Sequence, residues 1–167
     1  MIPLLAISAF SGTGKTTLLK QLIPLLQDRG IRCGLIKHTH HDMDVDKPGK
    51  DSYELRKAGA SQVMVASQKR WALMTETPGN DEPDFHSLAS RMDQSSLDII
   101  LVEGFKHESL PKIVLWRGGD EERLRSLLDE HVIAVASDCT LSLPFPVINI
   151  NNPKMVTDFI LKWLEHN

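Results

Sequence analysis

A short segment rich in glycine and threonine, residues 9–17, has the most chemically distinctive spacing in the chain. It reads Ala-Phe-Ser-Gly-Thr-Gly-Lys-Thr-Thr and directly follows the apolar run Leu4–Ile7. In a phosphate loop of this kind, backbone N–H groups surround phosphate oxygens, Lys15 reaches the β- and γ-phosphates, and the Thr16 hydroxyl ligates Mg²⁺. The residues expected to bind the phosphates are Gly12, Thr13, Gly14, Lys15, Thr16 and Thr17.

The loop departs from the usual pattern at its first position, where Ala9 replaces glycine. Alanine adopts a positive φ only at a cost, so we expect Gly12 to supply the conformational freedom instead. A glycine-rich turn with a solvated lysine is the plainer alternative. The apolar strand before the loop and the helical pattern after it favour phosphate binding.

A second chemical signal is the carboxylate at the end of the apolar run Leu97–Val102. Ligands gather at the carboxyl ends of strands in open α/β sheets. Glu103 is therefore a candidate to hold Mg²⁺ through a water molecule or to orient an attacking water, and Gly104 would let the backbone pass close to the phosphates. Asp98 lies at the opposite end of the run and is the poorer candidate. An ordinary solvated carboxylate is the alternative for Glu103.

The polar loop after Ile31–Lys37 concentrates histidines and carboxylates. Lys37 or His38 could contact a phosphate, and Asp46 and Asp51 could position Mg²⁺ or water, which makes them further catalytic candidates. Histidine and aspartate also suit Zn²⁺ or Ni²⁺, although the spacing matches no closed structural site. For any single histidine, a solvated loop is the better interpretation.

Asp138, after the apolar run Val132–Ala136, is a candidate to contact the base. A carboxylate accepts the N1–H and N2–H₂ groups of guanine and does not suit adenine. A helix or turn cap next to Ser137 is an equally good interpretation.

The elements that must position these residues alternate between strands and helices. Alternation of this kind predicts an α/β fold with a doubly wound, mostly parallel sheet flanked by helices, of the P-loop NTPase type. Gln62–Ser67 and Arg70–Glu76 break the alternation and predict a β-hairpin, near 62–76, at the sheet edge. We expect one domain, 1–167. The other expected strands are Leu4–Ala9, Ile31–Lys37, Leu97–Val102, Lys112–Trp116, Val132–Ala136 and Pro146–Ile150, and the expected helices include Lys15–Arg29, Phe85–Met92, Asp120–Glu130 and Pro153–Glu165.

Composition excludes some partners. The 167 residues carry a net charge of −3, which gives no general attraction to nucleic acid or to an anionic membrane. No apolar segment is long enough to span a bilayer, and the N-terminus has no signal-peptide pattern. Cys33 and Cys139 are expected to be core thiols in a reducing compartment, which predicts a cytoplasmic protein.

Several blocks, taken in order, resemble the molybdopterin-guanine dinucleotide biosynthesis adaptor family, called MobB. The resemblance covers nearly the whole chain. The blocks are the phosphate loop into Thr16-Thr17-Leu18, Lys37-His38-Thr39-His40-His41, Asp46-Lys47-Pro48-Gly49-Lys50-Asp51-Ser52, Ala58-Gly59-Ala60 and Leu101-Val102-Glu103-Gly104-Phe105-Lys106.

The resemblance implies a protein that binds GTP and Mg²⁺ and assists attachment of GMP to molybdopterin. The nucleotidyltransferase MobA would be the partner that performs the transfer. Family members are dimers with at most slow GTP hydrolysis. Because molybdopterin bears a phosphate, the resemblance also suggests a second anion site near Lys37, His38, Lys50 or Lys106.

Two rival functions share the phosphate loop. A small-molecule kinase would need an arginine-rich lid, for which Arg117, Arg123 and Arg125 are the only cluster. A metal-delivery GTPase would use the histidine and aspartate loop at 38–46, with His40 and His41 as ligands. The absence of an arginine placed by a motif favours an adaptor over a strong enzyme.

Overall fold

The computed structural model describes residues 2–39, 43–77, 79, 84–104 and 108–167. By their internal contacts they divide into two compact units: Met1–His38 with Asp84–Asn167, and Thr39–Pro83. Each unit is described by itself below, and the expectation of a single domain stays a prediction.

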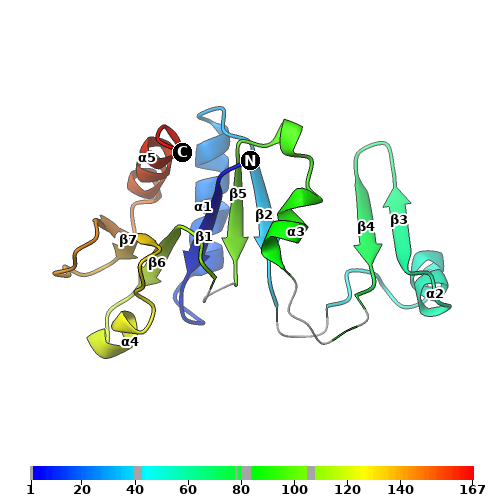
Figure 1. Ribbon diagram of the computed structural model, residues 1–167, viewed down its shortest axis with the longest axis horizontal. Coiled ribbons are helices and arrows are strands. Elements are labelled where there is room, and N and C mark those ends of the chain that lie inside the picture. Colours follow the sequence, from blue (N-terminus) through cyan, green and yellow to red (C-terminus); the bar gives the residue numbers. More distant parts are fainter. Residues whose placement is uncertain (1, 40–42, 78, 80–83, 105–107) are drawn as a thin grey trace. The chain divides into compact units, whose positions relative to one another are not determined.

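The first unit is built on a six-stranded sheet in the order β2-β5-β1-β6-β7-β8 (Figure 1). Each neighbouring pair in it is parallel. This confirms the predicted α/β class and its mostly parallel sheet. The strands are β1 (Leu4–Ser8), β2 (Cys33–Lys37), β5 (Ile99–Glu103), β6 (Lys112–Trp116), β7 (Val132–Ser137) and β8 (Val147–Asn149).

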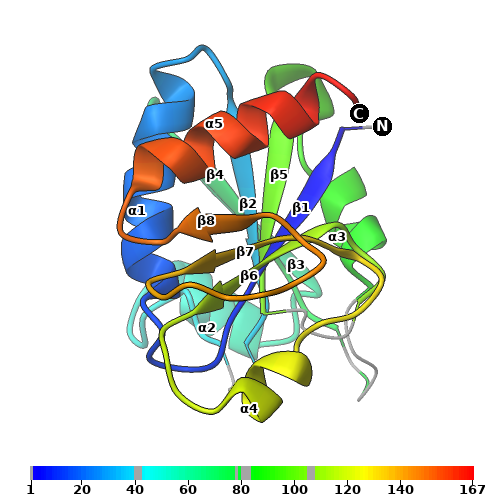
Figure 2. The ribbon, with the colours of Figure 1, turned by 90° about the vertical axis from the view of Figure 1, so that its left-hand side faces the viewer.

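Helices cover both faces of this sheet, as a doubly wound fold requires. α1 (Lys15–Gln27) and α5 (Pro153–Leu164) lie on one face (Figure 2), and their leucine, valine and isoleucine side chains form one core with β1 and β5. α3 (Phe85–Ser90) and α4 (Glu121–Arg125) pack on the other face, in two further clusters. Every residue of β1, β5 and β6 is buried, because helices cover both sides.

The helix expected over Asp120–Glu130 ends early, at Arg125. Asp129 gives the physical reason. Its Oδ2 accepts a hydrogen bond from the ammonium of the fully buried Lys112 at 2.7 Å, and its Oδ1 accepts one from the backbone N–H of His131 at 2.9 Å. A buried ammonium needs a charged partner. Pairing therefore takes Asp129 into the turn before β7 and out of the helix.

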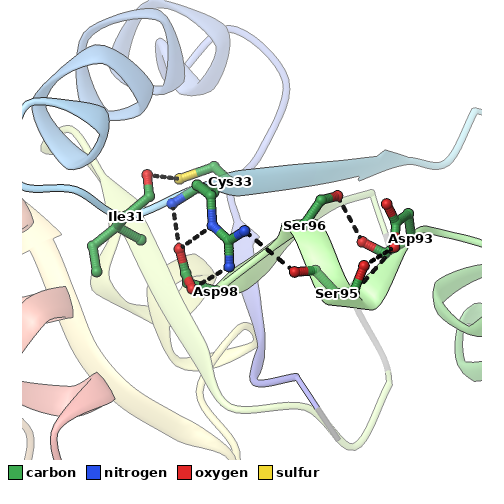
Figure 3. Close-up of polar contacts among 7 residues, drawn as sticks. Ile31, Cys33, Asp93, Ser95, Ser96 and Asp98 are labelled. Carbon is green, nitrogen blue, oxygen red and sulfur yellow. Dashed lines mark hydrogen bonds and ion pairs between the residues drawn. The ribbon is translucent and has the colours of Figure 1, made fainter.

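The amino ends of β2 and β5 are joined by an ion pair (Figure 3). Arg32 donates to Asp98 through Nε and an Nη atom, both at 2.9 Å, and through its backbone N–H at 2.8 Å. These bonds lower the pKa of Asp98 to about 2. Asp98 therefore holds two strands together at the end of the sheet opposite Glu103, which agrees with its being the poorer candidate for a site residue.

The two cysteines differ from each other. Cys33, beside this ion pair, is half-buried, and burial raises the pKa of its thiol to about 11. Cys139 is exposed, so the expectation that both are core thiols was wrong for Cys139. Its backbone N–H donates to the Ser137 hydroxyl at 3.1 Å in the turn after β7, which places it outside the strand.

The second unit contains α2 (Asp51–Lys57) and the antiparallel strands β3 (Gln62–Ala66) and β4 (Trp71–Thr75). The hairpin predicted near 62–76 is confirmed. Within the described residues, β3 and β4 pair only with each other, so the expectation that they extend the edge of the main sheet was wrong. Arg56 on α2 forms ion pairs with Asp44 and Glu76, which tie the helix to the end of β4.

Among the described residues, no helix has both the length and the apolar character needed to cross a bilayer.

Candidate functional site

The phosphate loop joins the carboxyl end of β1 to the start of α1, as its sequence context predicts. Gly12 and Gly14 have φ angles of 81° and 92°, which favour glycine, and Gly14 is the N-cap residue of α1. Ala9 is buried and has no positive φ, because among the described residues only glycines do. Gly12 therefore provides the turn that Ala9 does not.

Lys15 and Lys37 both approach the carboxylate of Glu103. Lys15 Nζ lies 3.7 Å from Glu103 Oε1, and Lys37 Nζ lies 3.9 Å from Oε2. Glu103 ends β5 and is buried, with 8% of its surface exposed, whereas the Lys37 side chain is 59% exposed. The parallel register puts Lys37 directly beside Glu103 on the neighbouring strand. Lys15 and Lys37, which were predicted to contact phosphates, thus meet Glu103, the predicted metal ligand, at the carboxyl ends of the strands.

Gly104 follows Glu103 directly, and its Cα has almost no free space around it for a side chain. Its φ is 103°, and a Cβ atom there would lie 2.6 Å from the carbonyl oxygen of His38. The His38 backbone N–H donates to the Glu103 carbonyl at 2.7 Å. Only glycine lets the chain after Glu103 pass so close to the end of β2. The close approach at Gly104 is thus to His38. The expected passage of this backbone close to the phosphates stays a prediction.

This arrangement fits a polyphosphate with a divalent cation. The loop lies at the N-terminus of a 13-residue helix, whose backbone N–H groups and dipole attract anions. Lys15 brings an ammonium to the loop, and Thr16 and Thr17 are exposed hydroxyls beside it. The Glu103 carboxylate is an oxygen donor of the kind Mg²⁺ prefers. Among the described residues, no cluster of three or more histidine, cysteine, aspartate or glutamate side chains is placed to hold a metal on its own.

Arg117, which the sequence places only in the arginine cluster of the kinase alternative, lies at this site. It follows β6, and its Nε donates to the Thr13 carbonyl of the phosphate loop at 3.0 Å. Another guanidinium nitrogen donates to Asn151 Oδ1 at 2.8 Å and lies 3.6 Å from Asp138 Oδ2. The same strand-end rule that identifies Glu103 would have found Arg117, because it follows an apolar strand of the same sheet. Asp138, the predicted base contact, faces this arginine.

Three predicted residues lie in the second unit. Asp46 Oδ1 accepts hydrogen bonds from the Lys47 backbone N–H at 3.0 Å and the Ser52 hydroxyl at 3.1 Å. Within the described part of the chain, Asp46 Oδ2 is buried without a hydrogen-bond partner. Asp51 begins α2, and Lys50 is its N-cap residue. Their catalytic and anion-binding roles stay predictions.

Two other predictions fall outside the described residues. The first concerns Lys106, which was proposed for the second anion site. The second concerns His40 and His41, the ligands in the metal-delivery alternative.

A family model and two curated relatives that match this chain all name the same family. A family model described as "Molybdopterin guanine dinucleotide synthesis protein B" (MobB) matches residues 4–138. The chain is 66% identical, over 99% of its length and 95% of the relative's, to the molybdopterin-guanine dinucleotide biosynthesis adapter protein of Escherichia coli (strain K12). It is 48% identical to the protein of that name from Haemophilus influenzae, over 99% of this chain and 91% of the relative.

A solved structure supports the fold. The crystal structure of a MobB protein homolog from Bacillus stearothermophilus superposes with a TM-score of 0.75, at 23% identity, over 98% of this chain and 99% of that one. At this identity the likeness shows the fold alone, a mostly parallel sheet flanked by helices. The matches to the family model and to the two adapter proteins place the chain in the molybdopterin guanine dinucleotide synthesis protein B (MobB) family.

Proposed function

We propose that the protein is a GTP-binding adapter in molybdopterin-guanine dinucleotide biosynthesis. The observation that carries this proposal is the phosphate loop, with Gly12 and Gly14 at positive φ and Lys15 held at Glu103, in a chain of this family. In the proposal, loop amides and Lys15 bind the phosphates of GTP, and Thr16 and Glu103 hold Mg²⁺. The cation supplies charge neutralisation between phosphate oxygens.

Glu103 has a specific part in this proposal. Its carboxylate lies 3.7 Å from the Lys15 ammonium and 3.9 Å from that of Lys37, so it holds Lys15 near the loop and balances the charge of Lys37 as well. A buried carboxylate between two lysines keeps their charges close to the strand edge and limits the reorganisation that binding requires. Lys37, which is more exposed, is a candidate for the second anion site, where it would meet the phosphate of molybdopterin.

The adapter would present its nucleotide to a nucleotidyltransferase of the MobA type, which attaches GMP to molybdopterin. The names of the E. coli and H. influenzae relatives support a place in this biosynthesis. Arg117 binds the Thr13 carbonyl of the loop, Asn151 and Asp138. A guanidinium held by three protein groups serves to shape the loop more than to stabilise a transferring phosphoryl group, which supports slow hydrolysis at most.

The same proposal includes a homodimer, and the hairpin of the second unit supports it. The register of β3 and β4 puts Met64 opposite Leu73, and Ala66 opposite Trp71, on one face of the hairpin. Met64, Leu73 and Trp71 are 59%, 42% and 63% exposed. Large apolar side chains gathered on one face mark an interaction surface. We assign that surface to a second copy of this chain.

Replacement of Lys15 tests the nucleotide proposal. We expect Lys15→Ala to weaken GTP binding by about 100-fold or more in calorimetric titration with Mg²⁺, because it removes the only side-chain cation assigned to the β- and γ-phosphates. Lys20→Ala is the matched control, since Lys20 is an exposed lysine on the same helix. Equal GTP affinity in the wild type and in a folded Lys15→Ala variant would refute the site.

A further inference from the structure

A groove beside the phosphate loop lies at the point where the order of the sheet reverses. From β1 the chain moves to β2 and β5 on one side, and from β6 it moves to β7 and β8 on the other. β1 and β6 are adjacent, with Ser8 beside Val114 in the register. In open α/β sheets the crevice at such a reversal, outside the carboxyl ends of the strands, is where ligands bind.

The groove is lined by the segments that leave these two strand ends. Residues 10–13 come from the phosphate loop, residues 116–120 follow β6, and Arg123 comes from α4. Its volume is about 260 Å³. That is smaller than the ~300–1,000 Å³ of sites that enclose a whole drug-sized ligand. The groove therefore suits one ring system of a ligand whose remainder lies on the adjoining loop.

Aromatic and cationic side chains meet at the groove. The Phe10 and Trp116 rings meet edge to face, with centroids 6.4 Å apart, and the Arg123 guanidinium lies 4.7 Å from the Phe10 ring centroid. Gly118 leaves open space, because a Cβ atom added there would meet no atom within 4 Å. Trp116 is buried beneath the groove, whereas Arg123 is exposed. A planar guanidinium beside open space suits the stacking of a heterocyclic base.

One carboxylate, that of Asp120, lines this groove. Asp120 Oδ1 accepts the backbone N–H of Glu122 at 2.9 Å, which fixes the side chain as the cap of α4. Asp138, by contrast, lies against Arg117 and is not one of the lining residues. A carboxylate pairs with two adjacent N–H donors, which guanine presents at N1 and N2 and adenine does not.

We propose that this groove binds the guanine base of the nucleotide whose phosphates occupy the loop, with Asp120 as the residue that selects guanine. The assignment rests on the proposed nucleotide function and replaces Asp138 as the base contact. Arg117 is then a positioning residue, because it joins the two walls of the groove through the Thr13 carbonyl.

Asp120→Asn tests the assignment without removing the helix cap, because asparagine caps helices as well as aspartate does. The exchange replaces an acceptor oxygen by an N–H₂ donor. We expect GTP affinity to fall by about 10- to 100-fold. Affinity for xanthosine triphosphate, which has a carbonyl in place of the 2-amino group, should rise. Affinity for inorganic tripolyphosphate should stay unchanged, since it reports the loop alone.

Asp138→Asn is the matched control, and it should keep the preference for GTP over ATP and over xanthosine triphosphate. The base assignment is overturned if Asp120→Asn leaves that preference unchanged, or if Asp138→Asn is the variant that alters it. Either result would leave the phosphate site intact as long as Lys15→Ala weakens the binding of tripolyphosphate as it weakens that of GTP. A wild-type protein that binds neither GTP nor tripolyphosphate would overturn both proposals.

Discussion

At the scale of single residues, two groups of ion pairs lie at opposite ends of the strands of one sheet. Glu103 meets Lys15 and Lys37 at the carboxyl ends of the strands, and Asp98 meets Arg32 at the amino ends. Both carboxylates flank the same apolar run, so sequence position alone predicts their opposite locations. The second partner of Glu103 follows from strand order, which the sequence does not contain, since β2 pairs with β5 and not with β1.

The Arg32–Asp98 pair predicts a specific response to acid. Because the folded-state pKa of Asp98 is lowered from 3.8 to about 2, its stabilising contribution is present above about pH 4 and is lost as the pH falls through about 2. We expect Asp98→Asn to lower the free energy of unfolding at neutral pH and to flatten its decline in acid. Urea denaturation from pH 7 to pH 2 measures both.

Asp158→Asn provides the comparison for Asp98→Asn. Asp158 pairs with Arg29 at 3.4 Å on the surface, with both side chains more than half exposed. Exposed pairs contribute little, so this variant should follow the wild-type acid profile. Superimposable acid profiles for wild type and Asp98→Asn would show that the Arg32–Asp98 pair does not stabilise the fold.

At the scale of elements, the strands and the long helices could be predicted because their patterns are strong. β1 and β5 are continuous apolar runs, and α1 repeats leucines on one face. α4 was predicted too long, because a turn anchored by Asp129 on a buried lysine looks like a helix in the sequence. Two strand-like segments in succession, at β3 and β4, predicted a hairpin, but their sequence does not say which sheet a hairpin joins.

The junction of β5 with the chain beyond it depends on Gly104. We expect Gly104→Ala to reduce the free energy of unfolding by about 1–3 kcal/mol, because it forces a positive φ on alanine and brings a Cβ atom to 2.6 Å from a backbone oxygen. Chemical denaturation monitored by circular dichroism measures the loss.

Gly30→Ala separates the two contributions to the Gly104 effect. Gly30 also has a positive φ, 82°, but a Cβ atom there would meet nothing within 4 Å. This variant should therefore lose only about 1 kcal/mol, the ordinary cost at a helix end. Equal losses for the two alanine variants would argue that the close approach to His38 has no energetic consequence.

At the scale of the whole molecule, the sequence predicted the fold class and the family resemblance, and the comparisons confirm both. It did not predict the groove beside the loop, because Phe10 and Trp116 are 106 positions apart in the sequence. In the sequence, Phe10 belongs to the phosphate loop and Trp116 to the apolar run Lys112–Trp116. They come together because β6 pairs with β1, on the side of β1 opposite to β5.

The proposed dimer makes a prediction at this scale. We expect the wild-type protein to sediment as a dimer and Trp71→Glu to shift it to monomer, because a charge on the exposed apolar face of the hairpin opposes burial. Val65→Glu is the control, since Val65 is 46% exposed but points to the opposite face. Dissociation by Val65→Glu and not by Trp71→Glu would move the interface to the other face. A monomeric wild type would exclude it.

Backbone amide shifts on addition of GTP and Mg²⁺, followed by nuclear magnetic resonance, test the central claim most directly. The account predicts that the largest changes fall on Gly12, Gly14 and Lys15, and that inorganic tripolyphosphate reproduces them. Changes centred on other strand ends or on the hairpin, with the amides of residues 12–17 unmoved, would contradict it.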